Sequence, residues 1–135
     1  MDELRAAFDE HLGERWQARR ADELLIAVKG GRHLRVYVID GEVVSVTRYT
    51  SADGRFTSNH PQGGTTEPCR GLHPEAEELA VQAAATGMLI AAVDVLFRDE
   101  RAFVLCEING SPGWERTNPA VPDAIARCVA ARVRR

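Results

Sequence analysis

A short hairpin signal constrains the fold of this chain more than any other feature of its sequence. Asp40-Gly41 is a dipeptide that favours two-residue turns, and it joins two runs of strand length, Arg32–Ile39 and Glu42–Tyr49. The runs read RHLRVYVI and EVVSVTRY, which are rich in the β-branched and aromatic residues found in strands. We therefore expect an antiparallel pair of strands in this part of the chain.

A two-residue turn also predicts which side chains share a face of this hairpin. It places Arg48 opposite His33, so that both side chains point to the same face as Arg35. Arg35 alone would be an ordinary exposed cation, whereas Arg35 together with Arg48 indicates a surface that binds anions. The other face is then apolar, with the side chains of Leu34, Val36, Val38 and Val43.

The spacing of apolar residues predicts the remaining elements. We expect helices over 1–20, 74–86 and 119–133, strands over 23–29, 89–97 and 102–108, and a long loop over 50–71 that is rich in Gly, Ser, Thr and Pro. Because strands outnumber helices and meet through tight hairpins, we predict an α+β fold with a largely antiparallel sheet and helices on one face. Residues 1–22 would form an N-terminal amphipathic helix, and 23–135 a single compact domain.

Charge and composition argue against several classes of function. A net charge of -3 disfavours a general nucleic-acid or membrane-surface partner, because phosphate-rich partners attract positive surfaces. No apolar run approaches the roughly 20 residues that a membrane span needs. The three cysteines, Cys69, Cys106 and Cys128, are odd in number and lack metal-ligand spacing. We interpret them as reduced thiols of a cytoplasmic protein without a role in the chemistry.

A second constellation centres on Asp94, which interrupts an apolar strand over 91–97. A carboxylate in such a strand is costly unless it is paired or coordinated. In the next strand Glu107 and Asn109 point to one face, because side chains alternate along a strand. If the connecting loop holds two or four residues, Asp94 shares that face. A three-residue loop, the case that we do not expect, would turn it away.

Two carboxylates at one spot repel each other, and a hard divalent cation relieves that repulsion. With the amide oxygen of Asn109 the set is all oxygen, which suits magnesium better than zinc. The alternative is a solvated strand face whose carboxylates pair with nearby arginines, namely Arg48, Arg98 or Arg101. The spacing alone leaves both interpretations open.

Four segments, in the same order along the chain, carry a resemblance to a known family. Glu107–Gly113 reads EINGSPG and resembles the Glu-x-Asn-x-x-Pro-Gly signature of RimK-type ATP-grasp carboxylate–amine ligases. Gly31–Val38 resembles the family's Gly-x-Asp-x-Arg-Val-x-Val strand, 56–64 its Phe-Arg-x-Asn-x-x-x-Gly-Gly loop, and 92–94 its Gly-Val-Asp strand. The resemblance covers roughly residues 24–133 and implies the C-terminal lobe of an ATP-grasp domain.

This resemblance implies a reaction in which ATP phosphorylates a substrate carboxylate and an amine then attacks the acyl phosphate. It implies ATP and magnesium (or manganese) as cofactors, with Asp94, Glu107 and Asn109 as the metal ligands. By position, Arg48 becomes a catalytic cation near the transferring phosphoryl group. The cofactor-binding residues would be Arg35, Ser58, Asn59, Gly63 and Gly64. For the Gly-Gly pair a flexible turn is the alternative.

The chain also departs from the family pattern. Family members hold the nucleotide phosphates with lysines of a further lobe, whereas Lys29 is the only lysine here, and His33 stands where the family has Asp. Three readings follow. A second polypeptide or a second copy supplies the missing lobe, or the chain is a degenerate remnant that binds magnesium, a phosphate ligand or a partner protein without catalysis. In the third reading it is a fragment of a longer gene product.

Overall fold

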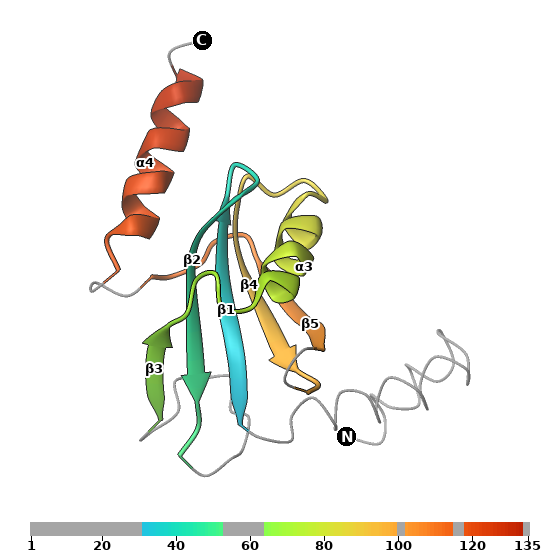
Figure 1. Cartoon of the computed structure of the whole chain (residues 1–135). Coiled ribbons are helices and arrows are strands. Elements are labelled where there is room, and N and C mark those ends of the chain that lie inside the picture. The colour runs from blue at the N-terminus through green and yellow to red at the C-terminus, as the bar shows by residue number, and fades with distance from the viewer. Residues whose placement is uncertain (1–30, 53–63, 100–101, 115–117, 134–135) are drawn as a thin grey trace, which may run out of the picture.

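The computed structural model describes residues 31–52, 64–99, 102–114 and 118–133. Within these ranges five strands form one antiparallel sheet in the order β3-β2-β1-β4-β5 (Figure 1). The predicted α+β fold with an antiparallel sheet is confirmed, while the helix predicted over 1–22 and the strand over 23–29 lie outside the described residues. The elements are β1 (Arg32–Ile39), β2 (Glu42–Thr50), β3 (Thr65–Pro68), α3 (Pro74–Ala84), β4 (Ile90–Phe97), β5 (Phe103–Asn109) and α4 (Ala120–Val133).

The turn between β1 and β2 is the predicted two-residue turn. Asp40 and Gly41 have positive φ angles of 56° and 80°, and Ile39 pairs directly with Glu42 across the turn. Positive φ at both turn positions defines a type I′ turn, whose twist matches that of the flanking strands. The dipeptide therefore determines where the chain reverses.

A β-bulge in β2 changes the register beyond this turn. Val44 is an extra residue that has no partner of its own in β1, and every later pairing is shifted by one position. Arg48 consequently lies opposite Leu34 rather than opposite His33. Because directly opposed residues share a face, Arg48 points away from the face of Arg35. The prediction that these cations share a face is therefore wrong.

The edge strand β3 lies within the segment that the sequence predicted to be a continuous loop. Its four residues, TTEP, pair with the end of β2, from Thr50 opposite Thr65 to Thr47 opposite Pro68. All four are exposed, and proline is tolerated at an edge because no further strand needs its missing N–H group. The loop prediction fails at this strand because its composition is that of a turn-rich segment.

The helix α3 covers one face of the sheet. Its buried residues follow helical spacing and are all small, namely Ala76, Ala80, Ala83 and Ala84. They pack against the apolar side chains of that face, which are Leu34, Val36, Val38, Val46, Val93, Val95 and Phe97. Pro74 begins the helix, where its missing N–H group removes no helical hydrogen bond.

The helix α4 packs against the opposite face. In Figure 1 it lies on the β2 side of the sheet, away from α3. Its buried residues Val121, Ala124 and Cys128 form a second, smaller core with Tyr37, Ile39 and Ala92 of the sheet. The expectation that the helices cover one face of the sheet is therefore wrong for this pair of helices. The reason lies in β1, whose even-numbered side chains face α3 while Tyr37 and Ile39 face α4. No helix in the described ranges is long and apolar enough to cross a membrane.

Candidate functional site

The hairpin of β4 and β5 brings the predicted metal ligands together by an unexpected route. The backbone N–H of Arg98 donates to the carbonyl of Ala102 at 2.8 Å, which leaves three residues between them in the loop. This is the loop length that would turn Asp94 away from Glu107. A bulge at Cys106 compensates, so that Asp94 lies directly opposite Glu107.

Asn109 completes the predicted set on the same face. It lies two residues beyond Glu107 in β5 and pairs opposite Ala92 of β4. Its side-chain oxygen accepts a hydrogen bond from the backbone N–H of Ser111 at 3.1 Å, which holds the amide in place at the end of the strand. The juxtaposition of Asp94, Glu107 and Asn109 on one face is therefore confirmed, whereas their role as metal ligands stays a prediction.

Asp94 is the single charged residue that is buried among the described residues, with 7% of its surface exposed. Its partner is Arg35, which lies directly opposite on β1. The Nε of Arg35 donates to Oδ1 of Asp94 and its Nη2 donates to Oδ2, both at 2.8 Å. This is a bidentate ion pair, so both carboxylate oxygens are engaged by the guanidinium. The predicted alternative of a carboxylate paired with arginine therefore holds for Asp94, with a different arginine from those expected.

Aromatic rings line the other side of Arg35. The rings of His33 and Tyr49 are stacked with centroids 4.8 Å apart, and the guanidinium carbon of Arg35 lies 5.9 Å from the Tyr49 ring centroid. The hydrogen bond to Asp94 is the main cause that raises the pKa of Arg35. Burial lowers the pKa of His33 below its ordinary value of 6.5, because desolvation disfavours the charged ring. Arg35 is therefore the cation of this cluster.

The loop after β5 is fastened to the same face of the sheet. The hydroxyl of Tyr37 donates to the carbonyl of Gly113 at 2.7 Å, and Pro112 is buried. Tyr37 lies two residues from Arg35 in β1, and so it shares that residue's face. No motif marks Tyr37 in the sequence, although strand alternation from Arg35 would have placed it on this face.

Arg48, predicted to be a catalytic cation, is held elsewhere. It forms an ion pair with Glu67, which lies directly opposite on β3, and it points to the α3 side of the sheet. The predicted phosphate-binding residues Ser58, Asn59 and Gly63 lie outside the described residues. Gly64 immediately precedes β3, a strand that β2 and β1 separate from β4. The structure thus brings neither Arg48 nor Gly64 to Asp94.

Cys106 is a neighbour of the site that the sequence analysis missed. All three cysteines are free thiols, but Cys69 and Cys128 are buried whereas Cys106 is exposed. Partial desolvation of the thiol chiefly, and then the charges of Asp94 and Glu107, raise the pKa of Cys106. Cys106 directly precedes Glu107 in β5, at the register shift next to Asp94. No sequence pattern signals it, because a bulge breaks the alternation on which strand faces are predicted.

The donor set fits a magnesium ion in its chemistry. Two carboxylates and one amide offer only oxygen atoms, and Mg²⁺ usually takes one or two carboxylates and completes its shell with water and phosphate oxygens. Among the residues that the structure describes there is no group of three or more His, Cys, Asp or Glu side chains that could hold a metal ion. As metal ligands, Asp94, Glu107 and Asn109 would therefore be a partial set that requires further ligands.

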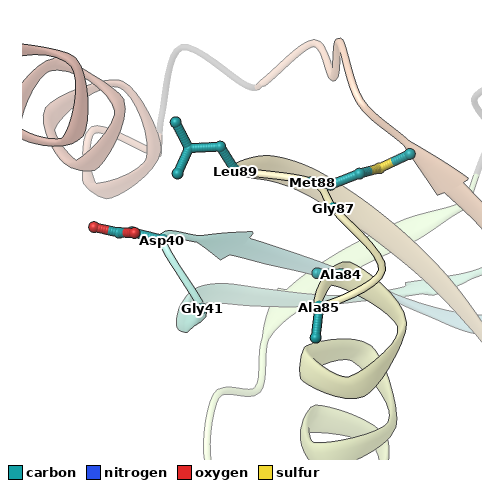
Figure 2. A pocket seen from close by; sticks show the side chains of 7 residues that line it. All are labelled: Asp40, Gly41, Ala84, Ala85, Gly87, Met88 and Leu89. Atoms are coloured by element: carbon teal, nitrogen blue, oxygen red, sulfur yellow. The ribbon is translucent and has the colours of Figure 1, made fainter. Parts of the chain in front are cut away.

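A shallow pocket lies away from this cluster. Its volume is about 260 Å³, and Asp94 is not among the residues that line it. Figure 2 shows it between the β1–β2 turn and the segment that joins α3 to β4. The lining residues are Asp40, Gly41, Ala84, Ala85, Gly87, Met88 and Leu89, which offer a single charged side chain.

Comparison with known proteins gives consistent results. The family described as RimK-like ATP-grasp domain matches residues 22–132. A "Probable alpha-L-glutamate ligase" of Parasynechococcus marenigrum (strain WH8102) is 41% identical over 107 residues, which are 78% of this chain and 22% of that protein. A protein of the same name from Cellvibrio japonicus (strain Ueda107) is 34% identical over 122 residues, 87% of this chain and 40% of that protein. The chain thus spans less than half the length of these relatives.

Solved structures show the same fold at low sequence identity. The ATP-grasp ligase PsnB complexed with a minimal precursor matches with a TM-score of 0.58 and 18% identity, over 76% of this chain and 34% of that one. PsnB complexed with a phosphomimetic precursor variant, Mg and ADP matches with a TM-score of 0.54 and 21% identity, over 73% of this chain and 33% of that one. The macrocyclase MdnC from Microcystis aeruginosa MRC, bound with its precursor peptide MdnA, matches with a TM-score of 0.53 and 14% identity, over 76% of this chain and 34% of that one.

Proposed function

Because the chain belongs to the RimK-like ATP-grasp family, we propose that it is the C-terminal lobe of an ATP-dependent carboxylate–amine ligase. One observation supports this most: Asp94 and Glu107 lie directly opposite each other, with Asn109 on the same face. In such a ligase ATP phosphorylates a carboxylate, an amine attacks the acyl phosphate, and phosphate leaves as the amide bond forms.

Each polar residue of this face has a part in the proposal. Asp94, Glu107 and Asn109 supply oxygen ligands to Mg²⁺ or Mn²⁺. The cation would neutralise charge on the nucleotide phosphates. Arg35 provides a positive charge on the same face, within reach of anionic groups that bind beside Asp94. Ser58, Asn59, Gly63 and Gly64 remain proposed phosphate contacts by position.

The length of the relatives bears on what a complete enzyme needs. The chain spans 22% and 40% of the two relatives described above. We include in the proposal that a further lobe completes the enzyme, supplied by a second polypeptide, by a second copy or by the rest of a longer product of the same gene. The relatives' names make L-glutamate the first substrate to test. We also propose a cytoplasmic location, because the reaction consumes ATP.

A second candidate function is binding without catalysis. The observation that favours it is the ion pair with Arg35, which engages both oxygens of Asp94. A family member that has lost catalysis would have no need to release this carboxylate. In that case the chain would act as a module that binds magnesium, a phosphate ligand or a partner protein.

Titration calorimetry with MgADP and MgATP separates these possibilities. The unaltered chain is expected to bind nucleotide saturably, and Asp94→Asn or Glu107→Gln is expected to weaken that binding. Asp40→Asn is a matched control, because Asp40 is an exposed aspartate paired with Arg132 at the other end of β1. Equal affinity in all four proteins would overturn the proposed site.

A turnover assay then tests the ligase itself. The chain is mixed with the ATP-grasp lobes of related ligases and with glutamate, and phosphate release is followed. Turnover that depends on Asp94 supports the ligase with a supplied lobe. Saturable nucleotide binding without turnover in any mixture supports the non-catalytic module.

A further inference from the structure

We propose that Arg35 is a built-in competitor of the divalent cation for Asp94, and that it thereby sets the cation affinity of this face. The inference rests on the proposed function, because it assumes that Asp94 is a metal ligand. It adds a control of metal affinity by a residue that is not itself a metal ligand.

The geometry of the ion pair requires competition. Arg35 donates through Nε to one oxygen of Asp94 and through Nη2 to the other, both at 2.8 Å. A carboxylate oxygen that coordinates a cation directs its lone pair at that cation, and the guanidinium carries a positive charge at the same place. Each oxygen of Asp94 has two lone-pair sites, and the guanidinium occupies one of them, so a cation that takes Asp94 must either displace a hydrogen bond or bind beside the positive charge of Arg35.

Burial makes this pair harder to displace than a surface pair. The side chains of Arg35 and Asp94 are 29% and 9% exposed, whereas those of Arg132 and Asp40, which also form an arginine–aspartate pair, are 44% and 55% exposed. Water screens the second pair and can replace its hydrogen bonds, but it has little access to Asp94. The competition should accordingly be strong at Asp94.

The displaced guanidinium has another place on the same face. Its central carbon already lies 5.9 Å from the Tyr49 ring centroid, a contact that does not depend on the oxygens of Asp94. Arg35 released from Asp94 is thus a cation beside the metal site, available to a phosphate oxygen. A nucleotide that brings both metal and phosphate would satisfy Asp94 and Arg35 together, whereas metal alone leaves Arg35 without its carboxylate.

The consequence is counter-intuitive: removing the positive charge of Arg35 from this site should tighten cation binding. A hydrogen-bonded charge pair of this kind contributes enough that its loss should raise the affinity for Mn²⁺ roughly tenfold to a hundredfold. Lysine in place of Arg35 keeps the charge but loses the bidentate geometry, so Arg35→Lys should raise the affinity by less.

The test measures binding of Mn²⁺ alone, without nucleotide, through the electron paramagnetic resonance signal of the free ion. Four proteins are compared: the unaltered chain, Arg35→Gln, Arg35→Lys and the control Arg132→Gln. We expect tighter binding in the order Arg35→Gln, Arg35→Lys, unaltered chain, with the control equal to the unaltered chain. Arg35→Lys keeps the test decisive if Arg35→Gln does not fold.

The outcomes distinguish this inference from the proposed function. Mn²⁺ affinity that is equal or weaker in both Arg35 variants, with saturable binding present, overturns the competition and leaves the metal site standing. Absence of saturable binding in all four proteins overturns the metal site and the competition with it. The third outcome is that Arg35→Gln binds Mn²⁺ more tightly than the unaltered chain, while the double variant Arg35→Gln with Asp94→Asn does not bind it. This pair of results supports both the metal site and the competition.

A second readout follows the ion pair directly. The Nε–H resonance of Arg35 in a proton–nitrogen NMR spectrum is assigned by its disappearance in Arg35→Lys. As Mg²⁺ is added, this resonance should shift in step with saturation, because Nε loses its carboxylate acceptor. A resonance that stays in place at saturating Mg²⁺ would contradict displacement.

Discussion

The two long hairpins of the sheet each contain one β-bulge, and the bulges act in opposite ways on the residues of the site. In the β1–β2 hairpin the bulge at Val44 follows an even-numbered turn and moves Arg48 to the far face. In the β4–β5 hairpin the bulge at Cys106 follows an odd-numbered loop and brings Glu107 opposite Asp94. The face of a strand residue thus depends on the loop and the bulge together.

This difference teaches a rule about parity. A one-residue change in register moves every later side chain to the other face, and a bulge is such a change. Two such changes in one hairpin cancel. In the β4–β5 hairpin the three-residue loop is the first change and the bulge at Cys106 is the second, so Asp94 and Glu107 share a face. One change alone does not, which is why Arg48 leaves the face of Arg35. The face that carries Arg35, Asp94 and Glu107 thus combines a hairpin in which two register changes cancel with a hairpin that has a single register change.

The largest effect is expected where the two hairpins meet, at the ion pair between Arg35 of the first and Asp94 of the second. Arg35→Leu leaves a buried carboxylate without its partner and should lower the free energy of unfolding by about 3 kcal/mol. Urea denaturation measures this. The double variant Arg35→Leu with Asp94→Leu should recover most of the loss, because no charge then stays buried without a partner. If the double variant is no more stable than Arg35→Leu, the ion pair does not hold the hairpins together.

A smaller effect is expected from changing the parity of β5. Insertion of one alanine after Cys106 should turn Glu107 and Asn109 away from Asp94 and abolish Mn²⁺ binding, at a cost of roughly 1–2 kcal/mol in stability. Deletion of Cys106 is the matched variant, because it removes the bulge but keeps Asp94 opposite Glu107. Mn²⁺ titration and urea denaturation follow both. Binding that survives the insertion and fails in the deletion would reverse the role that we assign to the bulge.

The contrast also explains how much of the molecule its sequence predicts. Turns and strands are local, so Asp40-Gly41 and the two long hairpins are predicted to within a residue at each strand end. The family signature around Glu107 and Asn109 is likewise read from adjacent residues. A bulge has no such local signal, because Val44 and Cys106 are ordinary strand residues by type.

What sequence reasoning missed depends on contacts between distant segments. The strand β3 exists because it pairs with β2, and the position of α4 depends on the core that it forms with Tyr37 and Ala92. The partner of Asp94 depends on the pairing of β1 with β4, residues 59 positions apart in the sequence. Alternation within β1 would have placed Tyr37 beside Arg35, but only the fold brings Gly113 to its hydroxyl.

A pH-dependent effect is expected from His33, which lies on the same face of the first hairpin as Arg35. Its pKa is lowered in the folded protein, chiefly by burial, so the unfolded chain takes up a proton at higher pH than the folded chain. Stability should therefore be independent of this group above pH 6.5 and should fall as the pH drops from 6.5 toward the folded pKa. In His33→Gln this part of the pH dependence of the free energy of unfolding should disappear. An unchanged profile would mean that His33 is not buried against Tyr49.

The smallest effect is expected from Arg48, which the bulge at Val44 places on the other face. Its ion pair with Glu67 is partly exposed, with side chains 30% and 51% accessible, so Arg48→Gln should lower stability by less than about 1 kcal/mol. Glu67→Gln removes the same pair from its other end and should have an equal effect. Neither variant should change Mn²⁺ affinity, because β1 separates this pair from Asp94 in the sheet. If Arg48→Gln weakens Mn²⁺ or MgADP binding while Glu67→Gln does not, Arg48 reaches the nucleotide site after all. The catalytic role predicted for Arg48 from its position in the sequence would then hold, although the register of the first hairpin places its side chain on the other face.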